Sequence, residues 1–144
     1  MSTKYHTIKK RIFDLVDAST DINKTVEYQD WFSGDFDKSY PLAIVNFKIL
    51  SADHSYYGTT TNCAAEAEYI IKVLFQDTTH TAILTKIDEV RKSLESTIMG
   101  DATILSLTTD IYKTKEEENI FKESNTGNYT LTLRVEFDFT DTNP

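Results

Sequence analysis

The segment Tyr129-Thr-Leu-Thr-Leu-Arg-Val-Glu-Phe-Asp-Phe139 carries the most regular pattern in this chain of 144 residues. Apolar and polar side chains alternate along its whole length. Because successive side chains of a β-strand point to opposite faces, the alternation predicts a strand with one buried and one solvated face, as in antiparallel sheets. The segment Asn125-Thr126-Gly127-Asn128, directly before it, predicts a turn.

A partner for this strand is expected directly upstream in the chain. Strand-like sequence runs from Ala102 to Tyr112 and breaks at the charged stretch Lys113 to Glu118. We therefore expect the two strands to pair as a hairpin with a long, charged tip at residues 113 to 128.

The first half of the chain predicts a second hairpin. Pro41 opens the strand Leu42 to Leu50, where the missing proline N–H matters least. This strand is apolar on one face and largely apolar on the other, which is typical of a central strand. The polar loop 51–63 leads to a further strand from Ala64 to Gln76.

Two segments have the apolar spacing of amphipathic helices. The first runs from Thr3 to Asp17, and the second begins near Thr79, a helix-capping residue type, and ends near Thr97, before Gly100. The apolar stripes are Ile8, Ile12, Leu15 and Val16 in the first helix, and Ile83, Ile87, Val90 and Leu94 in the second.

The order of these elements predicts an α+β fold. We expect a mainly antiparallel sheet of two β-hairpins, with the N-terminal helix and the central helix packed on one face. The length fits one domain spanning residues 1–144. Residues 22–40 are irregular and rich in aromatic residues, with a short strand at Thr25 to Tyr28.

Composition narrows the classes of function. The chain has 23 acidic and 15 basic residues, a formal net charge of −8. Because nucleic-acid binding depends on Lys and Arg side chains that neutralise phosphates, this acidic composition disfavours DNA binding. No apolar run approaches the roughly 20 residues that span a bilayer, and the N-terminus lacks the apolar core of a signal peptide. We expect no contact with a membrane and a cytosolic location in the producing cell.

No catalytic or metal-binding constellation emerges from the sequence. The three histidines lack metal-ligand spacing, and Cys63 has no second cysteine. The stretch Asp53-His54-Ser55 holds the residue types of a hydrolase triad but lacks the nucleophile turn. We expect neither a cofactor nor an enzymatic activity.

Surfaces for self-association are a stronger candidate. Long hairpin strands leave unpaired sheet edges, which invite pairing with another chain. Loop aromatics and the charged tip add groups that either pack locally or meet a partner. The candidate interface residues are Trp31, Phe32, Phe36, Tyr56, Tyr57, Lys113, Lys115, Glu116, Glu117, Glu118 and Phe121.

The pattern of elements resembles the tail terminator, or tail completion, proteins of long-tailed bacteriophages. The resemblance covers nearly the whole chain and follows the order of the elements. It departs from a generic tail protein in its acidity and in having only four glycines. The segments that carry it are the helix Ile8 to Val16, the proline-led strand Tyr40-Pro41-Leu42-Ala43-Ile44-Val45, the strand Ala67 to Phe75, the helix with Ile83, Ile87, Val90 and Leu94, and the strand Tyr129 to Val135.

The resemblance implies a structural virion protein in the tail or neck, assembled in the host cytoplasm. It implies a homohexameric ring on the last ring of the tail tube protein, which ends tube polymerisation and joins the tail to a head–tail connector or stopper protein. Six copies at −8 each give a charge of −48. A like-charged lumen lets DNA pass without specific binding.

An alternative from another class of function is a small α+β domain that binds a ligand or acts as an enzyme. In that case the aromatic loop covers a pocket. A His beside a carboxylate within about 3 Å in such a pocket would favour it.

Overall fold

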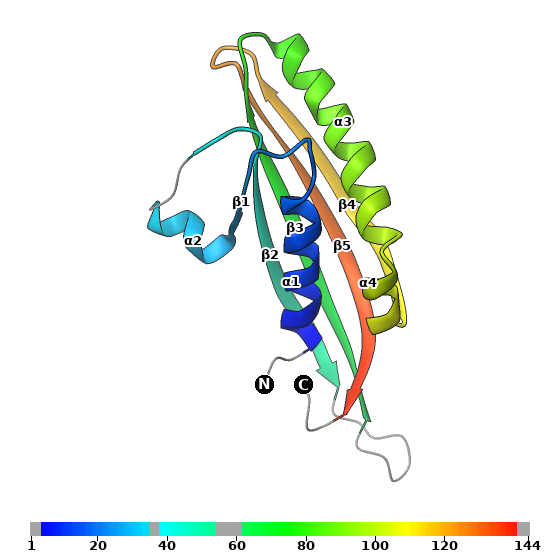
Figure 1. The fold of residues 1–144 in the computed structure, drawn as a ribbon. Helices are drawn as coiled ribbons and strands as arrows, with labels where there is room; N and C mark the ends of the chain where they lie inside the picture. The colour runs from blue at the N-terminus through cyan, green and yellow to red at the C-terminus, as the bar shows by residue number, and fades with distance from the viewer. Residues whose placement is uncertain (1–3, 35–37, 54–61, 141–144) are drawn as a thin grey trace.

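The computed structural model describes residues 4–34, 38–53 and 62–140. Helices and strands alternate irregularly along the chain (Figure 1). In order, they are α1 (Lys4–Asp17), β1 (Lys24–Glu27), α2 (Tyr28–Ser33), β2 (Leu42–Asp53), β3 (Asn62–Gln76), α3 (His80–Met99), α4 (Ala102–Leu107), β4 (Asp110–Phe121) and β5 (Thr126–Thr140).

The strands form one five-stranded sheet in the order β1-β2-β3-β5-β4. Adjacent strands from β2 to β4 are antiparallel, and the short β1 pairs parallel with Leu42–Val45 of β2. The two predicted hairpins are therefore present, joined at the centre of the sheet by β3 and β5. The structure confirms the predicted α+β class with a mainly antiparallel sheet.

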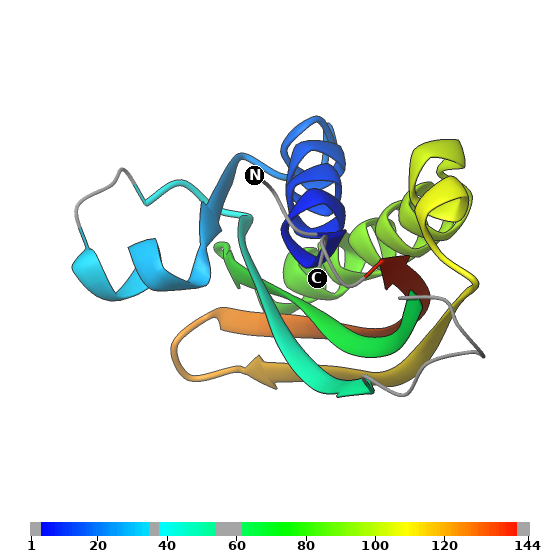
Figure 2. The same cartoon turned by 90° about the horizontal axis from the view of Figure 1, so that it is seen from below.

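Helices α1, α3 and α4 cover one face of the sheet, as the view from below shows (Figure 2). The alternation in β5 decides which face they cover. Leu131, Leu133 and Val135 are fully buried beneath the helices, whereas Arg134 and Glu136 point the other way. Helix packing on a single face leaves the second face of the sheet to other contacts.

Helix α1 packs on the sheet through the predicted apolar stripe. Ile8, Ile12 and Val16 are completely buried. At the start of the helix, the Tyr69 hydroxyl on β3 donates a hydrogen bond of 2.9 Å to the carbonyl oxygen of Tyr5. Burial raises the pKa of Tyr69, so this hydroxyl keeps its proton and remains a donor.

Helix α3 begins and ends close to the predicted residues. The Thr79 side chain accepts a hydrogen bond from the Ala82 amide, which caps one of the free N–H groups of the first turn. The helix ends at Met99 with Gly100 as its C-cap. Its buried stripe is Ile83, Ile87, Val90, Leu94 and Ile98.

The prediction of a strand from Ala102 to Tyr112 is wrong in its first half. Residues Ala102–Leu107 form α4, and the strand starts at Asp110. The cause is Asp101, whose carboxylate accepts a hydrogen bond of 3.0 Å from the Ile104 amide and caps the new helix. Ile104 is then fully buried against the main core.

The predicted long tip at residues 113 to 128 is also wrong. Strand β4 continues through the charged run to Phe121, and β5 begins at Thr126, so the turn is confined to residues 122–125. The strand survives because β4 lies at the edge of the sheet, where charged side chains reach water or α3. A bulge between Lys113 and Lys115 leaves Thr114 unpaired in the ladder.

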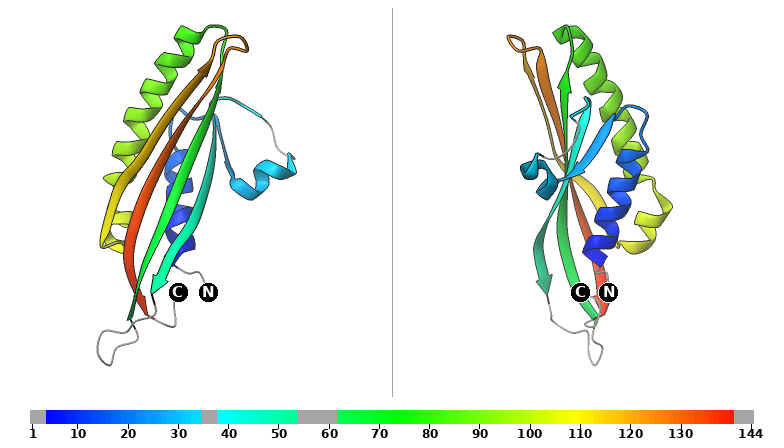
Figure 3. Two further views of the ribbon diagram at one scale, coloured as in Figure 1. Left: turned by 180° about the vertical axis from the view of Figure 1, so that it is seen from behind. Right: turned by 60° about the vertical axis from the view of Figure 1, so that its left-hand side comes forward.

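The stretch 22–40, predicted to be irregular apart from one short strand, contains that strand and a helix. Strand β1 matches the predicted strand within one residue at each end, whereas α2 was not predicted. Figure 3 shows α2 beyond the β1 edge, on the side of the sheet away from α1 and α3.

An ion pair joins α1 to the start of α4. The Arg11 guanidinium donates two hydrogen bonds to the Asp101 carboxylate, of 2.7 and 3.0 Å. These bonds, and the lesser one from the Ile104 amide, lower the pKa of Asp101 below its ordinary value. The ionised carboxylate therefore stabilises the fold at neutral pH, and this contribution is lost as the pH falls through the lowered pKa.

We expect Asp101→Asn to lower the free energy of unfolding at pH 7. The difference between the variant and the unaltered chain should shrink as the pH falls below about 4, where the carboxylate of the unaltered chain is protonated. Asparagine also caps helices, so the substitution removes the charge and keeps a capping oxygen. Urea unfolding midpoints at pH 7 and pH 3 measure the effect, with Asp17→Asn, at the exposed end of α1, as control. A loss of stability that is the same at both pH values would contradict the stabilising role of the ionised Asp101 carboxylate.

Candidate assembly surfaces

The sheet has unpaired backbone at both of its edges. Strand β4 is one edge over its full length, from Asp110 to Phe121. At the other edge β1 pairs only with Leu42–Val45, so β2 has no outer neighbour from Asn46 to Asp53 among the described residues. Such edges present unpaired N–H and C=O groups to another chain.

The predicted interface residues that the structure describes fall at these two opposite edges. Trp31 and Phe32 lie on α2, next to β1, and the predicted residues from Lys113 to Phe121 all lie on β4. Phe36, Tyr56 and Tyr57 lie outside the described residues. The structure thus separates the candidates into two groups on opposite sides of one sheet.

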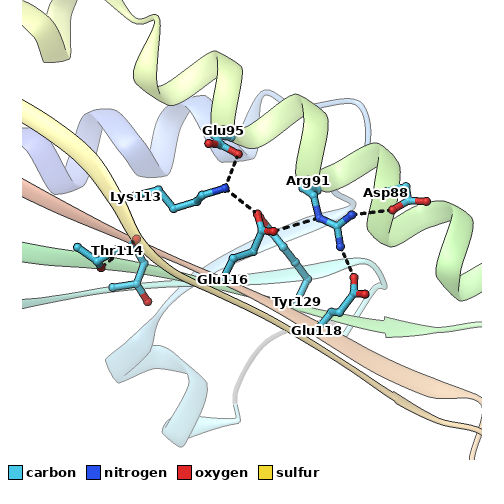
Figure 4. A network of polar contacts seen from close by, with 9 residues as sticks. Asp88, Arg91, Glu95, Lys113, Thr114, Glu116, Glu118 and Tyr129 are labelled. Carbon is cyan, nitrogen blue, oxygen red and sulfur yellow. Dashed lines mark hydrogen bonds and ion pairs between the residues drawn. The ribbon is translucent and has the colours of Figure 1, made fainter.

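Part of the charged run on β4 is held by α3. Arg91 on α3 forms ion pairs with Glu118 and, at 3.4 Å, with Glu116 (Figure 4). The same guanidinium contacts Asp88 one turn earlier, at 2.9 Å. One arginine therefore bridges the helix and the edge strand.

Glu116 is the centre of this network (Figure 4). The buried Tyr129 hydroxyl donates a hydrogen bond of 2.7 Å to its carboxylate, and Lys113 lies 3.5 Å away while also contacting Glu95. The hydrogen bond from Tyr129 is the main reason that the pKa of Glu116 is lowered, and the charges of Lys113 and Arg91 act in the same direction. The carboxylate stays ionised and ties β4 to α3.

The remaining candidates on β4 face away from α3. Downstream of the bulge, Lys115, Glu117 and Phe121 share the face of the sheet that the three packed helices leave open. Lys115 and Glu117 form an exposed ion pair of 3.0 Å with each other. Phe121 is 52% exposed at the end of the strand.

Helix α2 presents aromatic surface at the opposite edge. Tyr28 and Phe32 are exposed and pack edge to face, with ring centroids 4.8 Å apart. Trp31 turns inward onto a small apolar cluster and lies under the ammonium group of Lys38, 5.9 Å from its ring centroid. The buried members of this cluster are Val26, Leu42 and Ile44.

A cavity of about 290 Å³ lies between α2 and the open face of the sheet. We call it the α2 cavity. Its lining is mainly apolar, with Asn46 and the exposed Lys72 as its polar members on the strands. The complete lining is Tyr28, Trp31, Phe32, Ile44, Asn46, Ile70, Lys72 and Leu74.

Two of the residues that line this cavity, Trp31 and Phe32, are among the predicted interface residues. On the strands, the lining residues Ile44, Ile70 and Leu74 are apolar on a face that also carries polar residues, a pattern that is typical of a central strand. In the structure, these apolar residues of the second sheet face are buried or half-buried because α2 packs over them through Trp31.

No group of three or more His, Cys, Asp and Glu side chains gathers within the described ranges. None of the helices in those ranges combines the length and hydropathy that crossing a bilayer requires.

No protein-family model matches the chain, and no curated protein sequence matches it. Among solved structures, a chain from a structure described as the virion of a native gene transfer agent particle is similar, with a TM-score of 0.49 and 7% sequence identity. The match covers 89% of this chain and 92% of the other.

Proposed function

We propose that this chain is a structural virion protein that forms a ring, with six copies, at the head-proximal end of a bacteriophage tail. The ring ends polymerisation of the tail tube and joins the tail to the head connector. The protein acts by binding its neighbours and performs no chemical reaction. The proposal agrees with the family resemblance of the sequence and rests on the chain's own edges and charge.

The observation that carries the proposal is the pair of unpaired edges on opposite sides of one sheet. Contact between two different surfaces of the same chain is heterologous, and repeated copies then form a closed ring or a filament. In one copy β4 runs antiparallel to β2, because two further antiparallel strands separate them. Copies related by rotation about a ring axis keep the same direction, so β4 of one copy meets the free part of β2 of the next as an antiparallel neighbour.

The charge of the chain fits this role. A net charge of −8 for each copy gives a strongly acidic ring. An acidic wall repels phosphates, so DNA crosses the ring without being retained.

The test is the length of tails in the virus that encodes the chain. We expect virions lacking the protein to show overlong tails and unjoined heads by electron microscopy, with both defects reversed by supplying the chain in trans. Labelling of a tagged chain locates it at the head-proximal end. Tails of normal length joined to heads in its absence would overturn the proposal.

A small ligand-binding domain is the second candidate, and the α2 cavity is the observation that favours it. Its volume of about 290 Å³ lies at the low end of small-molecule pockets, which span roughly 300–1,000 Å³. A small aromatic compound that shifts the NMR signal of the Trp31 indole, in a chain that never self-associates, would favour this candidate over the ring.

A further inference from the structure

Two features of the open face have no partner within the described chain: the α2 cavity and the exposed ring of Phe121. They lie on the same face of the sheet. The strand residues that line the cavity, including Ile44 and Ile70, alternate with the buried residues of the helix-covered face. Phe121 follows Ile120, which packs against the main core, so Phe121 points to the open face as well.

The two features lie at opposite edges of the sheet. The cavity lies beside β1, and Phe121 ends β4, with β3 and β5 between them. A single chain therefore cannot bring Phe121 into its own cavity. Two copies placed edge to edge can, because the β4 edge of one then adjoins the α2 edge of the next.

Phe121 is the exposed side chain that best fits this contact. Tyr28 and Phe32 form the wall of the cavity itself. The other exposed large apolar side chains in the described ranges belong to the helix-covered side: Ile49 shares the face of Val45, and Leu84 and Leu105 lie on α3 and α4. A cavity of about 150 Å³ already admits benzene, so about 290 Å³ admits a phenyl ring.

The charges beside the two features are complementary. Lys72 lines the cavity and is exposed, with no acidic neighbour directly across from it on β2 or β5. Glu123 follows Phe121 by two residues and is exposed in the turn. An aromatic ring entering the apolar cavity would thus bring a carboxylate towards a lysine at its rim.

We propose that Phe121 of one copy inserts into the α2 cavity of the next copy, with Glu123 facing Lys72 of that neighbour. The proposal deepens the proposed function and rests on it for the existence of a ring. Each copy contributes one aromatic ring and one cavity, so the contact is heterologous and passes from copy to copy. Helix α2 then serves as the clamp that holds the neighbouring hairpin.

The test uses two variants that each disable one half of the contact. Phe121→Ser removes the aromatic ring, and Ile70→Glu places a charge in the half-buried lining of the cavity. We expect each variant to weaken self-association by about 30-fold or more, measured by sedimentation velocity over a concentration series. Leu105→Ser, a change at a similarly exposed apolar residue on α4, should assemble as the unaltered chain does.

Mixing the two variants gives the sharper result. In the mixture, Phe121 of the Ile70→Glu chain can enter the intact cavity of the Phe121→Ser chain. The altered cavity of the Ile70→Glu chain and the missing ring of the Phe121→Ser chain cannot form any further contact. We expect dimers of one copy of each variant and nothing larger, whereas the unaltered chain forms larger assemblies. Equal assembly of the variants and the unaltered chain would overturn the inference, as would an unaltered chain that stays monomeric at every concentration.

The outcome separates this inference from the proposed function. If virions carrying Phe121→Ser have tails of normal length while virions without the chain do not, the ring function stands and the Phe121 contact fails. If the mixture forms dimers but virions lacking the chain are normal, the contact stands and the proposed function fails.

Discussion

Replacing Leu94 with alanine lowers the free energy of unfolding by about 2–5 kcal/mol. Leu94 is the fourth of the five buried residues in the stripe of α3 and is 1% exposed. Truncation removes apolar contacts and leaves a cavity that the packed strands below cannot close. Because domains of this size are stable by about 5–15 kcal/mol, this one change removes a large share of the total.

The matched control for this experiment is Leu84→Ala, the same chemical change in the same helix. Leu84 is 41% exposed, and substitutions at such positions usually change stability by less than about 1 kcal/mol. Urea unfolding followed by circular dichroism measures both variants. Equal losses for the two would mean that α3 does not pack on the sheet through its predicted stripe.

Replacing Gly127 with alanine is expected to cost about 1–3 kcal/mol. Gly127 is the second residue of β5, beside the turn, where an added Cβ would lie 2.9 Å from the backbone oxygen of Asn119 and 2.9 Å from Cγ2 of Ile83. Both distances are shorter than real Cβ contacts, so β4 or α3 must move. Alanine also lowers the conformational entropy of the unfolded chain, and this effect offsets only about 0.4–1 kcal/mol of the cost.

The neighbouring substitution Thr126→Ala serves as control, since it adds no atoms at the same end of the strand. We expect a small loss from the hydroxyl contact with Ser124, measured by the same unfolding assay. If Gly127→Ala were as stable as the unaltered chain, the close packing of α3 and β4 around Gly127 would be contradicted.

The elements predicted well are those whose pattern is local. The alternation in β5 and the spacing of Ile83, Ile87 and Val90 in α3 each reflect a face buried along one continuous segment. Periodicity reports such burial directly. The N-terminal helix and the strands β2 and β3 were predicted for the same reason.

The failures depend on contacts between distant residues. The charged run of β4 resembled a solvated tip because its partner, Arg91, lies on another element. Helix α4 resembled a strand because the Asp101 cap outweighs a short, ambiguous apolar pattern. The α2 cavity draws its lining from three separated segments, and no pattern along a single segment reveals such a site.

The bulge at Thr114 keeps the second half of β4 in its orientation although the strand carries one extra residue. Lys113 faces α3, and regular alternation would send Lys115 to the same side, but the inserted residue turns Lys115 outward. Deleting Thr114 would remove the bulge and leave Lys113 and Lys115 paired with the adjacent residues Leu133 and Thr132, so Glu117 and Phe121 would keep their outward orientation. The bulge thus absorbs one extra residue in the edge strand without turning the aromatic end of the hairpin over.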